Sequence, residues 1–195
     1  MKQAIFLLLD EYADWEAAYL SATLNESREW AVSTISLHEQ VTSIGGFKTA
    51  VDYKVNNHPD FDLLVLIGGN TWSIESDDIY SLVDQAFNKN TPVGAICGAV
   101  DYLAKNGFLN HFKHTGNSAY FWQNYENYKP DVEFMEDQAV KDKNLVTANG
   151  TAPIEFTELV LHMVNFDTAE EIEKTMYMYR YGFYEYAEKY GNPFL

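Results

Sequence analysis

The sequence contains few cysteines and few basic residues, which excludes several kinds of binding site. Its 195 residues include one cysteine, Cys97, which excludes an intrachain disulfide and a thiolate cluster around zinc or iron–sulfur. Basic residues are scarce, with 13 Lys and Arg against 29 Asp and Glu and a formal net charge of −16. Because phosphate groups are bound mainly by Lys and Arg, neither nucleic acid nor an anionic membrane surface is an expected partner.

Long apolar runs are also missing, and none approaches the length of a membrane-spanning helix. The first ten residues carry one positive charge and a short apolar run, which predicts a core strand and not a signal peptide. A cytoplasmic location is therefore expected. The histidines are scattered, so no metal site is predicted, and no other cofactor is expected.

What the sequence does contain is an alternation of strand-like and helix-like segments. Apolar runs at 4–9, 63–67 and 93–96 predict strands, as does the alternation of apolar and polar residues at 31–37. Segments 14–25 and 77–88 predict helices, with Asp14 as a possible N-cap. Gly45-Gly46 predicts a hairpin between 41–44 and 47–51. Short strands are predicted at 113–116, 132–135, 138–140 and 145–148, followed by helices at 152–166 and about 168–190.

This order predicts the α/β class. We expect one domain over residues 1–195, a three-layer sandwich whose mostly parallel, flavodoxin-like sheet has helices on both faces. The helix at about 168–190 is an addition to that domain. It carries aromatic side chains all round, which indicates burial, either against a partner subunit or against the chain's own core.

Cys97 lies at the turn from the buried strand 93–96 into a helix. Small residues surround it, as a sharp strand-to-helix turn requires. The N–H groups that begin the next helix are expected to favour the thiolate. The alternative interpretation is a buried cysteine that acts as a small hydrophobic side chain.

The carboxyl ends of parallel strands meet at one edge of the sheet, where such folds bind ligands. The segments that follow the strands at 4–9, 63–67 and 93–96 contain Glu16, Gly68-Gly69 and Cys97 respectively. These residues are therefore expected to converge on one site.

Four motifs carry a resemblance to a known family. They are an apolar strand with the acids of 14–16 (DWE) after it, then 62–69 (DLLVLIGG), 92–99 (PVGAICGA) and 114–118 (HTGNS). With the tail 145–152 (LVTANGTA), they resemble the ThiJ/PfpI superfamily over about residues 3–166. The resemblance implies the fold of class I glutamine amidotransferases, a reactive cysteine, and a homodimer, which is common in the superfamily.

Position by position, the resemblance implies roles for five residues. Cys97 matches the nucleophile, Glu16 the acid that lies against its sulfur, and His114 a histidine near it. The backbone N–H groups of Gly69 and Gly98 match an oxyanion hole. Protease-like members often have His directly after the cysteine, where this chain has Gly98, so His114 is the candidate partner.

Three functions are compatible with these residues. The first is a cysteine-dependent hydrolase, amidase or lyase, in the intracellular protease/amidase branch, that acts on a small carbonyl or amide-like electrophile. The second is a stress-response redox sensor in which Cys97 oxidises to sulfinic acid without turnover. The third is a non-catalytic module that binds a metabolite.

Overall fold

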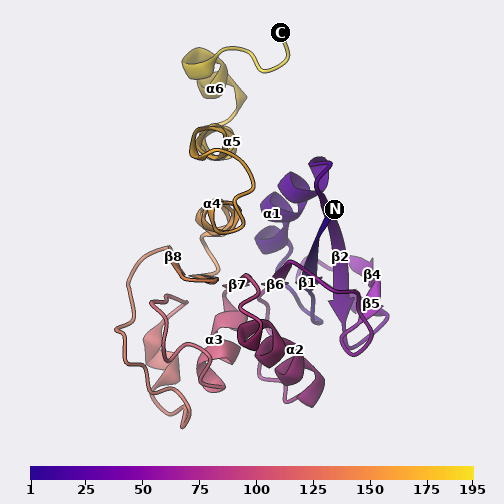
Figure 1. Ribbon diagram of the computed structural model, residues 1–195, viewed down its shortest axis with the longest axis vertical. Helices are drawn as coiled ribbons and strands as arrows, with labels where there is room; N and C mark the ends of the chain where they lie inside the picture. Colours follow the sequence, from indigo (N-terminus) through magenta and orange to yellow (C-terminus); the bar gives the residue numbers. More distant parts are fainter.

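A seven-stranded sheet forms the centre of the protein, in the strand order β5-β2-β1-β6-β7-β9-β8. The computed structural model describes all of residues 1–195 (Figure 1). The strands are β1 (Lys2–Leu7), β2 (Trp30–Ser36), β3 (Gln40–Thr42), β4 (Lys48–Ala50), β5 (Tyr53–Lys54), β6 (Leu63–Leu66), β7 (Val93–Ile96), β8 (Ala139–Asp142) and β9 (Leu145–Ala148). All neighbours in this sheet are parallel except β8 and β9, and β3 and β4 form a separate antiparallel hairpin.

Helices cover both faces of the sheet and complete three layers (Figure 1). They are α1 (Asp14–Glu26), α2 (Asp77–Asn88), α3 (Gly98–Lys105), the 3-10 turn η1 (Ala119–Trp122), α4 (Pro153–Met163), α5 (Ala169–Tyr181) and α6 (Phe183–Tyr190). Side chains that alternate along β1 separate the two cores. Ile5 and Leu7 pack with α2 and α3, whereas Ala4 and Phe6 pack with α1 and α4. The predicted α/β fold is confirmed.

Three local predictions are wrong. Residues 113–116 and 132–135 form no strands, because only one isolated bridge, His114 to Phe134, joins them. Asp14 is the first helical residue and not the N-cap, which is Ala13. The carboxylate of Asp14 instead accepts a hydrogen bond from the N–H of Gly45 at 2.8 Å and so ties the hairpin to α1.

The C-terminal segment also differs from the single helix predicted at about 168–190. Gly182, with a φ of 84°, ends α5 and begins α6. Ile172 and Met176 of α5 are buried in the core next to α4, but α6 has no buried residue. In Figure 1 the two helices extend beyond α4, away from the sheet. The sequence left open whether this segment is buried against a partner subunit or against the chain's own core. One face of α5 is buried against the chain's own core.

Candidate active site

Cys97 occupies a strained turn at the carboxyl end of β7. Its φ of 58° and ψ of −127° lie outside the conformations that a residue with a side chain normally adopts. The turn is held in place because the N–H of Cys97 donates a hydrogen bond to the carbonyl of Ala148, on β9, at 3.0 Å. Helix α3 starts at the next residue, so the predicted strand–cysteine–helix turn is present.

Two glycines make room for the cysteine. A Cβ added to Gly150 would lie 2.8 Å from the sulfur of Cys97. A Cβ added to Gly68 would lie 2.5 Å from both the Cβ of Cys97 and Oε2 of Glu16. Both contacts are closer than real Cβ atoms show, so the side chains of Cys97 and Glu16 can meet only because these two positions have no side chain.

Glu16 is fully buried and is the third residue of α1. Its Oε2 accepts a hydrogen bond from the N–H of Gly68 at 2.8 Å, whereas Oε1 is buried without a hydrogen-bond partner. Burial raises the pKa of Glu16 to about 7, against the opposing effects of the Cys97 thiol and the Gly68 N–H. A carboxyl group with this pKa can both accept and donate a proton near neutral pH.

The thiol of Cys97 differs from the sequence-based expectation. Burial raises its pKa above the ordinary value, and the negative charge of Glu16 raises it further. Hydrogen bonds from Asn117 and from the N–H of Gly98 oppose this increase without reversing it. The start of α3 therefore does not by itself produce a free thiolate, because the nearest charged group is an acid and not a base. Cys97 and Glu16 form a coupled pair of acids.

Asn117 is a site residue that sequence reasoning missed. Its Nδ2 donates a hydrogen bond to the sulfur of Cys97 at 3.3 Å, and its Oδ1 accepts one from the N–H of Gly150 at 2.9 Å. The indole N–H of Trp15 donates to the carbonyl of the same glycine at 2.9 Å. Asn117 lies within the HTGNS motif, whose resemblance to the family implied a role for the histidine and not for the asparagine.

His114 is not brought to the sulfur. The residue is fully buried, and its Nδ1 pairs with the carbonyl of Phe112 at 2.7 Å. The other ring nitrogen, Nε2, pairs with the hydroxyl of Tyr128 at 2.8 Å. Burial lowers the pKa of His114, so the neutral ring is favoured. With both nitrogens engaged among aromatic side chains that include Trp122, the imidazole has no nitrogen free for Cys97.

The two backbone groups expected to form an oxyanion hole do lie together. A Cβ on Gly98 would lie 2.6 Å from the carbonyl oxygen of Gly69. The N–H of Gly69 donates no hydrogen bond within the chain. That of Gly98 begins α3 and has no acceptor within the helix, and it faces the sulfur of Cys97. Both glycines line a cavity of about 390 Å³.

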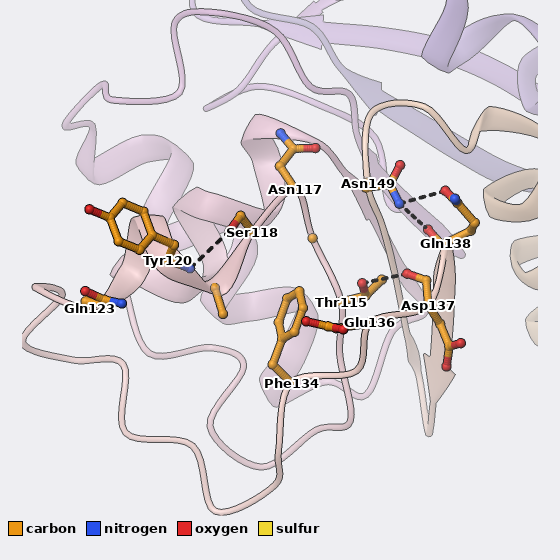
Figure 2. A pocket seen from close by; sticks show the side chains of 12 residues that line it. Thr115, Asn117, Ser118, Tyr120, Gln123, Phe134, Glu136, Asp137, Gln138 and Asn149 are labelled. Atoms are coloured by element: carbon orange, nitrogen blue, oxygen red, sulfur yellow. Dashed lines mark hydrogen bonds between the residues drawn. The ribbon is translucent and has the colours of Figure 1, made fainter.

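A larger cavity, of about 650 Å³, has Asn117 in its lining. Figure 2 shows Asn117, Tyr120, Phe134, Asp137 and Asn149 among the side chains that line it. The sulfur of Cys97 lines neither cavity, so each adjoins the reactive atom, the smaller one through Gly98 and the larger one through Asn117. No group of three or more His, Cys, Asp or Glu side chains gathers anywhere to hold a metal ion, and no helix is both long and apolar enough to cross a membrane.

The fold and the site define a class: α/β proteins that carry a cysteine on a tight strand-to-helix turn, paired with a buried glutamate. Comparisons with known proteins specify the family. The model of the DJ-1/PfpI family matches residues 2–163. The chain belongs to that family.

Individual relatives agree with this assignment. The chain is 60% identical over 196 residues to "Uncharacterized protease YdeA" of Bacillus subtilis (strain 168), across 100% of both proteins. It is 38% identical to "Uncharacterized protease YoaZ" of the same organism over 161 residues, 76% of this chain and 77% of that protein. A crystal structure of a ThiJ/PfpI family protein from Bacillus anthracis superposes with a TM-score of 0.88 and 34% identity, covering 96% of this chain and 94% of that one.

Proposed function

We propose that the protein is a cysteine-dependent enzyme, a hydrolase, amidase or lyase, that acts on a small carbonyl or amide-like electrophile. The observation that carries the proposal is the pairing of Cys97 with the buried carboxyl of Glu16, whose Oε1 has no hydrogen-bond partner. A free carboxylate oxygen beside a thiol supplies the adjacent base that nucleophilic catalysis by cysteine requires. The curated relatives named as proteases are in keeping with this chemistry.

In the proposed reaction on an amide, the sulfur of Cys97 attacks the carbonyl carbon while Glu16 takes the thiol proton. A C–S bond forms, and the electron pair of the C=O bond moves to oxygen, which accepts hydrogen bonds from the N–H groups of Gly69 and Gly98. Glu16 then returns the proton to the nitrogen as the C–N bond breaks. Water hydrolyses the resulting thioester, and the thiol is restored.

Glu16 alone carries the proton in this scheme. A pKa of about 7 makes its carboxylate a stronger base than an ordinary glutamate, and the protonated form a usable acid at neutral pH. His114 has no part in the scheme because both its ring nitrogens are occupied. Asn117 replaces it at the sulfur as a neutral hydrogen-bond donor that steadies the developing thiolate.

The test is turnover of a panel of small amides, glyoxals and isocyanides, followed by mass spectrometry. We expect Cys97→Ala to abolish turnover of any substrate that the wild type converts. Glu16→Gln keeps the shape of the side chain and should lower kcat strongly with little change in KM. Full activity of Cys97→Ala on such a substrate would show that nucleophilic catalysis is wrong. Asp14→Asn serves as the matched control, because Asp14 lies two positions before Glu16 in the first turn of α1.

The same pair also favours a second candidate function, the redox sensor. Peroxide would oxidise the thiolate of Cys97 to sulfenate and then, with a second peroxide, to sulfinate, releasing water at each step. A protonated Oε1 of Glu16 could donate a hydrogen bond to the sulfinate. Mass spectrometry of the intact protein after treatment with peroxide tests this candidate. If the mass of two added oxygen atoms on Cys97 does not appear at modest peroxide concentrations, the redox sensor is excluded.

The remaining proposals concern partners and location. The substrate is proposed to be a small molecule, and nucleic acid and membrane are not proposed as partners because of the net charge of −16. A homodimer and a cytoplasmic location stay predictions.

A further inference from the structure

The cavity that begins at Gly69 and Gly98 has one wall built by α3. Residues 98, 101, 102 and 105 line it at helical spacings of three and four, so they form one stripe on the helix. The opposite side comes from the segment after β6, with Asn70, Trp72 and Ser73. At about 390 Å³ the cavity has the size of a site for a small molecule.

Asp101 is the one acid that lines this cavity, and it has no cationic partner. Its Oδ1 accepts a hydrogen bond from the indole N–H of Trp122 at 2.7 Å, and it takes part in no salt bridge. The residue is half-buried, and burial raises the pKa of its carboxyl group. Trp122 therefore fixes one oxygen, while the negative charge is left without a counterion.

The other walls suit a cation. Trp72, Tyr102 and Tyr125 line the cavity, and the rings of Trp72 and Tyr102 pack with centroids 5.3 Å apart. Aromatic faces attract a desolvated ammonium group. The positive charge already present, on Lys105, is paired with Glu75 at 3.2 Å, so it does not neutralise Asp101.

We infer that this cavity is a subsite for a primary ammonium group of the substrate, with Asp101 as its counterion. The inference rests on the proposed function, since it supplies the class of substrate for the same cysteine: a small carbonyl or amide compound with an amine a few bonds from the reacting carbon. The electrophilic carbon lies at Cys97, its oxygen at Gly69 and Gly98, and its ammonium group beside Asp101. Asp101 is in this view a binding residue and takes no part in proton transfer to the sulfur.

The experiment uses two alkylating probes of the same shape, so it needs no known substrate. N-(2-aminoethyl)chloroacetamide carries an ammonium group where N-propylchloroacetamide carries a methyl group. With either probe the sulfur of Cys97 attacks the CH₂ carbon, a C–S bond forms and chloride leaves. Mass spectrometry of the intact protein gives the two rate constants, and their ratio, cationic over neutral, measures recognition of the charge.

Asp101→Asn is the deciding variant, because asparagine keeps an oxygen for the indole of Trp122 and loses only the charge. We expect the ratio to fall about tenfold, the loss typical of one charge-assisted hydrogen bond, with the rate of the neutral probe unchanged. The control Asp137→Asn removes an acid from the neighbouring larger cavity and should leave the ratio unchanged.

Each other outcome overturns the subsite. An unchanged ratio in Asp101→Asn shows that its charge recognises nothing. Equal falls in both variants show a general effect of the protein's negative field. A fall in the neutral probe as large as that in the cationic one shows a structural role for Asp101. Failure of the proposed function is seen separately, in turnover that survives Cys97→Ala, since the probe ratio requires no turnover.

Discussion

Replacing Glu16 by glutamine should make the protein more stable at neutral and alkaline pH, although it removes a central group of the site. Glu16 is fully buried, and its carboxyl group has a pKa of about 7 in the folded protein against 4.5 for the free group. Burial favours the protonated form, so the native state holds a proton that the unfolded chain releases above pH 4.5.

The sign and size of the effect follow from this difference. The contribution of Glu16 to stability is fully present below pH 4.5 and is lost as the pH rises to about 7. Each pKa unit corresponds to about 1.4 kcal/mol, so the wild type should lose about 3 kcal/mol of unfolding free energy relative to Glu16→Gln across this range. For a chain of this length, that is on the order of 6 to 12 °C in Tm.

The assay is urea or thermal unfolding of both proteins at several pH values between 4 and about 8.5, plotted as the difference in unfolding free energy. Titrations common to both proteins cancel in the difference. The matched control is Asp14→Asn. Burial raises the pKa of Asp14, but hydrogen bonds with Ser43 and Gly45 outweigh it and lower the pKa, so the wild type should lose its advantage over this variant as the pH falls. A flat difference curve for Glu16→Gln would refute the claim that burial holds a proton on this carboxyl group.

Three further predictions concern the surroundings of the sulfur and the C-terminal helices. Gly68→Ala should slow alkylation of Cys97 at least tenfold and destabilise the fold by about 2 kcal/mol, because the new methyl group would overlap both Cys97 and Glu16. Alkylation rates and urea unfolding measure the two effects, and values equal to those of the wild type would contradict the close packing around Gly68. Asn117→Ala should further raise the pKa of the Cys97 thiol, because it removes a hydrogen bond to the thiolate. The pH profile of iodoacetamide alkylation should therefore shift to higher pH. A profile identical to that of the wild type would show that the 3.3 Å hydrogen bond does not stabilise the thiolate. Deletion of residues 183–195 should convert the predicted homodimer into a folded monomer, because α6 has no buried residue within the chain. Light scattering of both forms tests this prediction, and a dimer that persists would place the interface elsewhere.

The sheet was predictable because its central strands are buried on both faces. Residues 63–66 and 93–96 are continuously apolar and fully buried, a pattern that few other structures allow. The carboxyl ends of these strands must then meet, which brings Gly68 and Cys97 together from sequence alone. The identity of the acid at the sulfur, Glu16 and not Asp14, came from the family motif.

The rest of the site depends on contacts between distant segments. Both ring nitrogens of His114 form hydrogen bonds, one with the carbonyl of Phe112 and the other with the hydroxyl of Tyr128. These two partners lie in an irregular stretch of the chain, whose contacts the sequence does not reveal. The elevated pKa of the Cys97 thiol could not be anticipated either. It results from burial and from the charge of Glu16, and local sequence around the cysteine reports only the helix that follows.

The strained turn at Cys97 determines what a side chain costs at this position. Cys97 has a φ of 58°, a conformation that glycine adopts without steric strain. Any residue with a side chain lowers the stability of the fold there by on the order of 1 to 2 kcal/mol. A change to glycine would also remove the burial of the sulfur beside Gly150. On backbone strain alone the position therefore favours glycine, so the fold holds the sulfur of Cys97 at a cost in stability that a glycine would avoid.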